Sequence, residues 1–482
     1  MHCLGIIVLF SILVRSVLSF KGGQMFWFDE MRFWNGYYIL TTIADYEYMN
    51  GLKIFITNFD HTLFQIFSIV LQGIRYFICK TFIDGDLQPF MLMESGIGLN
   101  ICTSLLSCTF AFSIIMMNKI LVIIGANKNL RIKIICCFAM SCSLIPYSRH
   151  LLPYDLAISI YLLSIYLILN KSYLVAGAAC MFSILMYNGY SALFYATVLF
   201  SILFIISNET KLFLKIRNYF IGVASILVVL QLFGYIVNIN YLHGLLEWKN
   251  YAQLVQQGDF GIGYKIFFEY LWETEFLFVI ILILPIIFFK QLIFHYHTKN
   301  ILFLGLFFCS SIFFILILQS DIIGRAVLYS RTINQIIPFL CIICGCGIYY
   351  FLSIKRINKY KIYFFLFVLF VWIYNFTPII QMRFPSEIKQ NTKFSANKTY
   401  DKSEFSKHKN ESIIKLENEN NQLLINCSQI FPGIKYYTKY NLSNVKWTIK
   451  HPYQYKPYQF MHFNKLERDL LERYPPKIRF GY

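Results

Sequence analysis

Asp29 and Glu30 are adjacent carboxylates in the stretch MFWFDEMRFWNG, which follows the first apolar segment of the chain. Partial desolvation at the boundary of the lipid headgroups strengthens a carboxylate as a proton acceptor, so the pair could provide a general base. Two adjacent carboxylates also repel each other, and a cation or a nearby arginine is expected to compensate. The alternative is a hydrated charge cluster, with Arg32 as the counter-charge and the neighbouring aromatic side chains as interface anchors.

Two further polar stretches contain candidate site residues. Asp60 and His61 lie in NFDHTLFQIF, in the same predicted loop as Asp29, although a single histidine is more often structural. In SRHLLPYDLAISIYLL, Arg149 precedes Tyr154 and Asp155 at the boundary between two apolar runs. An arginine at an interface can bind phosphate oxygens through two hydrogen bonds, and the alternative is an ion pair between Arg149 and Asp155 at the helix end.

The composition indicates that these residues lie in a membrane protein. The chain of 482 residues is 57% hydrophobic and 14% charged, with a mean hydropathy of +0.55, which indicates an all-α polytopic membrane protein. Segments of about 20 apolar residues predict a bundle of about 11 to 13 transmembrane helices. The predicted spans are 2–20, 97–117, 130–147, 154–170, 173–187, 189–207, 218–238, 276–289, 300–318, 333–352 and 361–380.

Charge patterning predicts the orientation of these spans. Basic connectors at 127–133, 208–218, 290–300 and 353–361 are typical of cytoplasmic loops. The first loop, about 21–96, is then external. Its apolar stretch 62–79 either is a helix along the membrane interface, which is favoured, or crosses the membrane together with a further span. The first apolar segment could be a signal peptide, but Arg15 interrupts it and no small-residue cleavage motif follows, so a retained first helix is favoured.

The chain divides into a membrane domain, 1–380, and an external tail, 381–482. The tail comprises a polar connector, 384–425, and an aromatic-rich cap, 426–482. The formal net charge of +18 is attributed to cytoplasmic loops and to a tail beside anionic headgroups, so membrane lipids are expected partners and nucleic acid is not. Cysteines within apolar runs act as small hydrophobic residues, and their spacing predicts no zinc site.

The order FDEMRFWNG, DHTLFQI, LIPYSRHLLPYDL and MYNGYSALF resembles the GT-C superfamily of membrane glycosyltransferases. The similarity is greatest to the bacterial branch with the lipid A aminoarabinose and rhizobial lipopolysaccharide core transferases, and protein O-mannosyltransferases are distant relatives. The motifs cover about residues 2–210, and GRAVLYSRTINQIIPFL resembles an arginine-bearing segment before a late family helix. Thr62 and Leu63 replace a Pro-Pro pair of the family, and Tyr154 stands where some members have an acidic residue.

This resemblance implies an inverting transfer of a sugar from a polyprenyl-phosphate donor to a lipid or surface-glycan acceptor. Asp29 would be the general base, and Glu30 would orient it or bind an optional divalent cation, Mg²⁺ or Mn²⁺. Arg149, with Arg331 or Arg325, would bind the donor phosphate. Asp60, His61, Tyr154 and Asp155 would shape the site on the external, periplasmic side of the cytoplasmic membrane.

Two other functions remain open at this stage. An O-antigen-type polysaccharide polymerase would also have many spans and external arginines, but with a large loop between late spans. A lipid or oligosaccharide transporter would more often carry ionisable residues near the bilayer midplane of repeated, broken helices. The polar residues of this chain fall on one predicted side, which favours the transferase.

Overall fold

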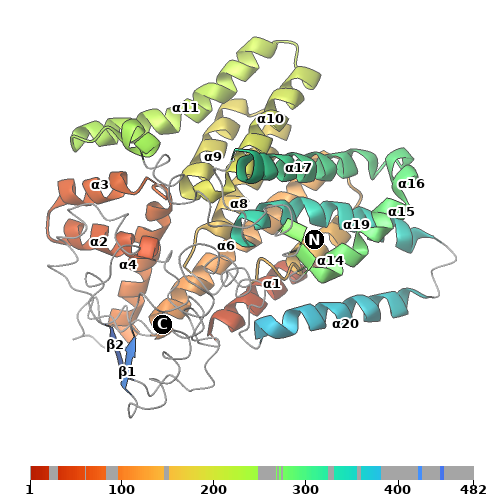
Figure 1. Cartoon of the computed structure of the whole chain (residues 1–482), viewed down its shortest axis with the longest axis horizontal. Coiled ribbons are helices and arrows are strands. Elements are labelled where there is room, and N and C mark those ends of the chain that lie inside the picture. Colours follow the sequence, from red (N-terminus) through yellow and green to blue (C-terminus); the bar gives the residue numbers. More distant parts are fainter. Residues whose placement is uncertain are drawn as a thin grey trace.

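Long apolar helices make up most of the structure. The computed structural model describes residues 2–20, 31–59, 61–82, 96–145, 151–247, 267–268, 271–272, 275–323, 330–354, 360–380, 422–425 and 446–449. Apart from one pair of short strands in the tail, the described part of the chain is that of an all-α polytopic membrane protein, as predicted (Figure 1). The principal helices are α1 (His2–Phe20), α6 (Gly96–Ile123), α7 (Lys128–Ala139), α8 (Tyr154–Leu169), α9 (Tyr173–Met186), α10 (Ser191–Asn208), α11 (Leu212–Ile236), α17 (Lys299–Ile317), α19 (Ile337–Ser353) and α20 (Lys361–Ile380).

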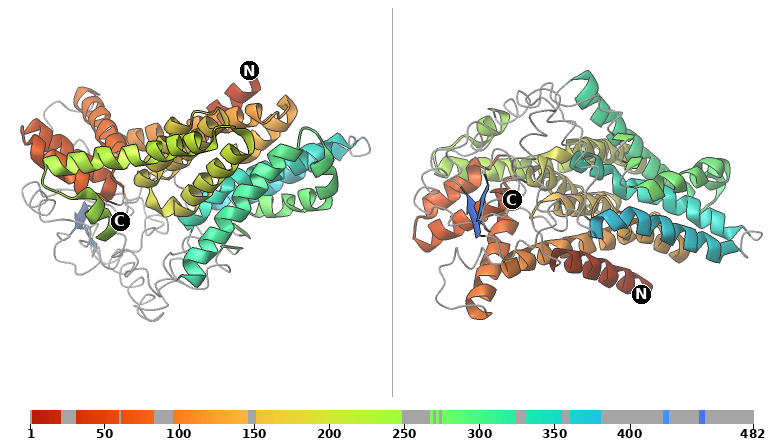
Figure 2. Two further views of the ribbon diagram at one scale, coloured as in Figure 1. Left: turned by 90° about the horizontal axis from the view of Figure 1, so that it is seen from above. Right: turned by 60° about the horizontal axis from the view of Figure 1, so that its bottom comes forward.

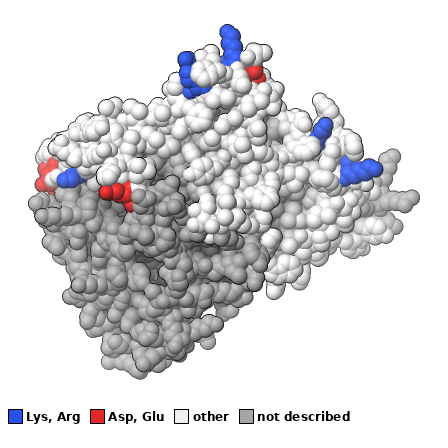
Figure 3. Space-filling model, turned by 45° about the horizontal axis from the view of Figure 1, so that its top comes forward, with Lys and Arg blue, Asp and Glu red and all other residues white. Residues whose placement is uncertain are grey.

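Five helical segments in the described part of the chain are long and apolar enough to cross a membrane. They are Ser104–Ile123, Asn188–Asn208, Leu212–Ile236, Lys299–Ser320 and Asn334–Ser353. The outward side chains of α11 include Val228, Leu232 and Ile236, all of which are exposed. Figure 3 shows a face on which the Lys, Arg, Asp and Glu side chains lie at the margins and leave a broad area between them without charge. An exposed apolar surface of this kind is suited to lipid.

The helices pack in two connected groups. In one group α8 and α11 both contact α9, and in the other α7 and α17 both contact α19. The helix α6 contacts both α7 and α8, and α1 runs along α6 (Figures 1 and 2). One buried apolar core, which includes Phe110, Ile134, Tyr161 and Phe308, extends through both groups.

The first predicted loop contains three helices: α2 (Met31–Ala44), α3 (Tyr48–Thr57) and α4 (Phe64–Phe82). They lie at one side of the molecule in Figure 1. The helices α2 and α4 approach closely at Gly36, where an added Cβ would collide with Ser68, and the Ser68 hydroxyl donates to the Phe33 carbonyl. The predicted helix over 62–79 is therefore present as α4, and its location at the membrane interface stays a prediction.

The predicted span 276–289 is interrupted. It forms three short helices, α14 (Phe276–Ile281), α15 (Ile283–Ile287) and α16 (Phe289–Phe294). Pro285 lies in the middle of α15, and proline has no N–H to donate to the preceding turn. It also packs against α19 at Gly347, where a Cβ would lie 2.5 Å from Pro285 Cδ.

The predicted spans 300–318 and 333–352 are joined by irregular turns. A π-helical turn, η4 (Leu318–Ile322), follows α17. A short helix, α18 (Ser330–Ile333), and a 3-10 turn, η5 (Asn334–Ile336), then lead into α19.

Most of the tail lies outside the described residues. Two short strands, β1 (Gln422–Ile425) and β2 (Lys446–Ile449), pair in parallel with Gln422 opposite Lys446. The pair joins the last residues of the predicted connector to the predicted cap.

Connectors predicted to share one side of the membrane are neighbours in the structure. Asn127 donates a 2.7 Å hydrogen bond to the Tyr349 hydroxyl, and the His295 ring contacts the Tyr349 ring. In a second set, Lys171 lies 2.9 Å from Glu209. Hydrogen bonds from Lys171 and Tyr173 hold the pKa of Glu209 below its usual range.

The crossing of α9 and α11 depends on two glycines, and substituting either should destabilise the fold. A Cβ at Gly177 would lie 2.0 Å from the Tyr219 carbonyl oxygen, and one at Gly222 would lie 1.9 Å from the Leu174 carbonyl oxygen. We expect Gly177→Ala to lower the free energy of unfolding by about 1–3 kcal/mol because the helices must separate. Thermal unfolding of the purified protein in detergent measures this change.

Gly73→Ala is the matched control, because nothing lies within 4 Å of a Cβ added there. Its melting temperature should equal or exceed that of the unmodified chain. Equal melting temperatures for the two variants would contradict the close packing of α9 on α11.

Candidate functional site

The four stretches that suggest a glycosyltransferase meet in one apolar cluster. Phe33 comes from the first stretch, Phe64 comes from the second, and Leu151 and Leu156 flank Tyr154 in the third. Met186 comes from the fourth stretch. These residues are all buried and pack together with Leu71, Cys102 and Leu106. Segments far apart in sequence are thus assembled at one location, beside α2 and α4.

Aromatic rings from three of these stretches form a second layer of contacts. The ring centroids of Tyr154 and Tyr187 are 4.5 Å apart, and those of His61 and Tyr187 are 5.4 Å apart. Tyr190 packs edge-on against Tyr187 at 4.7 Å. All four rings are buried. The structure therefore brings together the predicted site residues His61 and Tyr154 through Tyr187.

Thr62 and Leu63 stand where GT-C proteins have a Pro-Pro pair, and they make hydrogen bonds that proline could not. The Thr62 hydroxyl is 2.7 Å from the Asn58 carbonyl oxygen and 2.9 Å from the Tyr241 hydroxyl. The Leu63 amide donates a 3.2 Å hydrogen bond to the Leu185 carbonyl, and a proline at position 63 would have no N–H for it. The second stretch is thus attached by hydrogen bonds to α9 and to the residues after α11.

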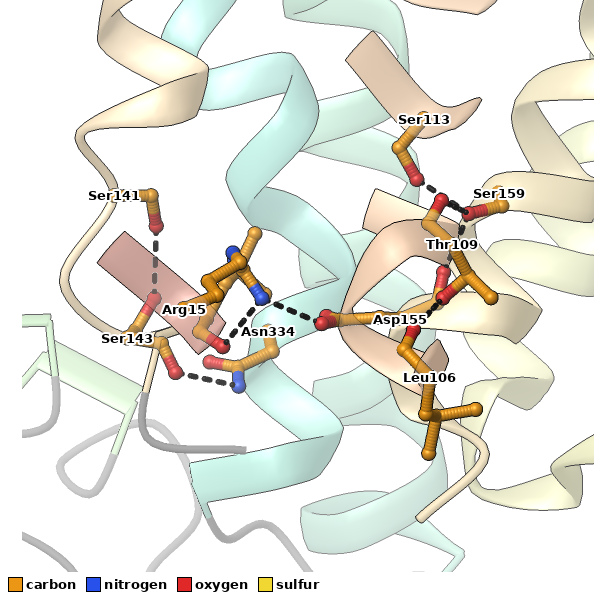
Figure 4. Close-up of polar contacts among 10 residues, drawn as sticks. Arg15, Leu106, Thr109, Ser113, Ser141, Ser143, Asp155, Ser159 and Asn334 are labelled. Atoms are coloured by element: carbon orange, nitrogen blue, oxygen red, sulfur yellow. Dashed lines mark hydrogen bonds and ion pairs between the residues drawn. The ribbon is translucent and has the colours of Figure 1, made fainter. Parts of the chain in front are cut away.

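Asp155 forms a buried ion pair with Arg15 of the first helix (Figure 4). The Arg15 Nη1 and Asp155 Oδ2 atoms are 2.6 Å apart, and the two side chains are 1% and 7% exposed. The guanidinium also lies 3.6 Å from the centre of the Phe110 ring and 3.5 Å from the Leu144 carbonyl oxygen. Asp155 begins α8, where a negative charge complements the helix dipole.

This pairing adds to what the sequence suggested for two residues. Arg15, taken from the sequence as an interruption of an apolar run, is an internal cation that joins α1 to α8. The alternative offered for Arg149 was an ion pair with Asp155, and Arg149 lies outside the described residues; the described partner of Asp155 is Arg15, 140 positions away in sequence. Sequence spacing gave no signal for this pair, because α1 and α8 are brought together by tertiary packing, in which each contacts α6.

The late arginine-bearing segment is attached to the fourth stretch. Gln335 Oε1 accepts a 2.7 Å hydrogen bond from the Leu193 amide, and its Nε2 donates to the Thr332 carbonyl at 2.5 Å. Ser191 donates to Gln319 at 3.1 Å. Arg331 lies within α18, which contacts the 3-10 turn η3 (Asn188–Tyr190), but its side chain lies outside the described residues.

Glu275 is a buried carboxylate that was not singled out from the sequence. It contacts Ser143, next to Leu144, whose carbonyl accepts from Arg15 of α1. Glu275, at the start of α14, is 1% exposed and accepts hydrogen bonds from Ser141, Cys142 and Ser143. The only sequence signal was an acidic residue immediately before an apolar run. An ionisable group buried in a membrane domain is a functional candidate by default.

The remaining predicted residues, Asp29, Glu30, Asp60, Arg149 and Arg325, lie outside the described residues. Among the residues that are described, no group of three or more His, Cys, Asp or Glu side chains could hold a metal ion. Glu30, the predicted cation ligand, lies outside the described residues.

Comparisons of the chain with family models, curated proteins and solved structures return no match.

The Arg15–Asp155 pair makes a prediction about stability. Arg15→Met leaves the Asp155 carboxylate buried without its cation, which should lower the free energy of unfolding by about 3–5 kcal/mol. Replacing both residues, as Arg15→Met with Asp155→Leu, removes both charges and should cost less than the sum of the two single changes. Thermal or denaturant unfolding of the purified variants measures these energies. Strictly additive losses would show that the two charges do not stabilise each other.

Proposed function

We propose that this chain is a membrane glycosyltransferase of the GT-C type. It transfers a sugar from a polyprenyl-phosphate donor to a lipid or surface-glycan acceptor, with inversion at the anomeric carbon. Transfer takes place on the external face of the cytoplasmic membrane. The membrane character of the chain is consistent with a lipid-linked donor, because such a donor reaches its enzyme within the bilayer.

One observation carries the proposal: the four stretches that resemble GT-C motifs converge. Phe33, Phe64, Leu156 and Met186 lie in one cluster. Asp29 is four residues before Phe33, so covalent geometry keeps their Cα atoms within about 15 Å. Asp60 directly precedes His61, and Arg149 is two residues before Leu151. The sequence neighbours of a base, a histidine and a phosphate-binding arginine are thus gathered at one location.

The proposed reaction is a single displacement. Asp29 accepts the proton of the acceptor hydroxyl as the hydroxyl oxygen attacks the anomeric carbon. The bond between that carbon and the phosphate oxygen breaks, and the polyprenyl phosphate leaves with the electron pair. Arg149, assisted by Arg331 or Arg325, binds the departing phosphate through charge-assisted hydrogen bonds. Glu30 orients Asp29 or holds a divalent cation.

The described residues of the site have positioning roles in this proposal. His61 and Tyr154 contact Tyr187 in a buried aromatic layer, and we assign this layer to supporting the reacting groups. Asp155 forms an ion pair with Arg15, so we assign Asp155 to fixing the position of α8 and, with it, Tyr154.

The uneven distribution of polar contacts in the bundle also favours a transferase over a transporter. Basic connectors gather around Tyr349 and around Glu209, while the motif stretches meet elsewhere, beside α2 and α4.

Asp29→Asn tests the proposed function most simply. The substitution removes the base at nearly constant volume, so we expect the protein to fold and insert normally while transfer falls by at least about a hundredfold. The measurement is sugar transfer in membranes that contain the variant. Asp45→Asn, at an exposed carboxylate just after α2, is the control and should retain full activity. Full activity of Asp29→Asn would exclude Asp29 as the base.

Arg149→Lys tests binding of the donor phosphate. Lysine keeps the charge but cannot form the paired hydrogen bonds of a guanidinium, so donor affinity should fall about tenfold while expression is maintained. Titration of a polyprenyl phosphate onto the purified protein measures the affinity. Arg131→Lys, at the start of α7 beside Asn118, should bind the donor normally. An unchanged donor affinity in Arg149→Lys would count against the phosphate role.

A further inference from the structure

The turn that follows α7 is held at each residue from Met140 to Leu144 by groups from other elements. Trp372 of α20 donates a 2.8 Å hydrogen bond to the Met140 carbonyl, and Arg15 of α1 donates to the Leu144 carbonyl at 3.5 Å. Asn334 of η5 donates to the Ser143 carbonyl at 3.2 Å. Figure 4 shows Ser141, Ser143 and Asn334 gathered close to Arg15. The Met140 and Ser141 amides bond back to the end of α7, and these further contacts satisfy other backbone groups of the turn inside the protein.

Glu275 occupies the centre of this arrangement. Its Oε1 atom accepts hydrogen bonds from the Ser141 hydroxyl at 2.5 Å, the Ser143 hydroxyl at 2.6 Å and the Ser143 amide at 2.8 Å. Its Oε2 atom accepts from the Cys142 amide at 3.2 Å. The Glu275 backbone is also fixed, because its carbonyl accepts from Phe278 and Val279 in α14. Hydrogen bonds to a charged group are stronger than those between neutral groups.

In the described part of the chain, the partners of the Glu275 carboxyl group are these hydrogen-bond donors. No described Lys, Arg or His side chain forms an ion pair with Glu275, whereas Asp155 has Arg15. A simple stabilising contact in a membrane bundle would need no buried charge, since apolar packing costs less. A buried carboxylate that collects the donors of one turn gives that turn a single geometry.

Glu275 fixes three elements. Two lead to segments that carry the proposed phosphate-binding arginines, and the third ends the stretch 239–275, which its alternation with the basic connectors predicts to be an external loop. The turn at Met140–Leu144 leads through Ile145 toward Arg149, and η5 directly follows the helix α18 that contains Arg331. Glu275 itself ends the predicted 239–275 loop. The bases of all three segments are therefore fixed relative to one another by one side chain and Asn334.

We propose that Glu275 is a positioning residue for donor binding: its carboxylate fixes the turn after α7 against α14 and η5, and so sets the separation of the segments that carry Arg149 and Arg331. This inference rests on the proposed function, because it assigns the arginines to the donor phosphate. Glu275 itself does not contact the substrate in this account.

Glu275→Gln is the informative substitution. If the glutamine oxygen occupies the Oε1 position, its amide nitrogen faces the Cys142 N–H, and two donors oppose each other. Glu247→Gln is the matched control, because Glu247 is exposed and pairs with His243 in the same helical segment. If Glu275→Gln does not fold, Ser143→Ala takes its place, since it removes a single hydroxyl donor to Oε1.

Hydrogen exchange of the full-length protein in nanodiscs tests the positioning role independently of function. Glu275→Gln should speed exchange at the Cys142 and Ser143 amides by at least about tenfold, and Glu247→Gln should leave it unchanged. Unchanged exchange at these amides in Glu275→Gln would overturn the inference.

Titration with a polyprenyl monophosphate tests the link to the donor. Glu275→Gln should weaken its affinity about tenfold, with little effect on the maximal rate once donor is saturating. Wild-type affinity in Glu275→Gln would overturn the inference and leave the proposed function standing. If the unmodified chain binds no polyprenyl monophosphate, the proposed function fails, and the role of Glu275 in donor binding fails with it.

Discussion

The ion pair between Arg15 and Asp155 connects the first helix of the chain to the helix that begins beside the candidate site. Charges within a membrane bundle are costly unless they are paired, so this contact fixes α1 and α8 in one arrangement on either side of α6. Arg15 also reaches the turn after α7, through Leu144. The same turn receives Glu275 and Asn334. Two buried carboxylates thus organise the helices around the end of α7.

The Arg15–Asp155 pair and the hydrogen bonds of Glu275 fix helices that carry or adjoin the motif stretches, which contain few polar residues themselves. The motif stretches approach each other through apolar residues and aromatic rings, which supply packing but little directional information. Direction comes from a few hydrogen bonds, such as those from Thr62 to Tyr241 and from Leu193 to Gln335. Thr62 and Leu63, which stand where GT-C proteins have a Pro-Pro pair, likewise anchor the second stretch by hydrogen bonds.

Hydropathy and charge predict the helices better than they predict their contacts. The span expected at 154–170 is observed as Tyr154–Leu169, because a long apolar run leaves few alternatives. The helices α2 and α3 were not separately predicted, since their aromatic and polar residues also suit a loop. The division of 276–289 follows from Pro285. His61 and Tyr154, both named from the sequence, lie in one aromatic layer, whereas the partners of Asp155 and Glu275 depend on tertiary packing that no local pattern encodes.

The central claim is that the chain transfers a sugar from a polyprenyl phosphate to a cell-surface glycan. The most direct measurement is mass spectrometry of polyprenyl-phosphate sugars and of surface glycans from cells with and without the chain. The account predicts that one polyprenyl-phosphate sugar accumulates when the chain is removed, and that the corresponding residue disappears from a lipid-linked or surface glycan. Identical lipid-linked sugars and identical glycans in the two kinds of cell would contradict it.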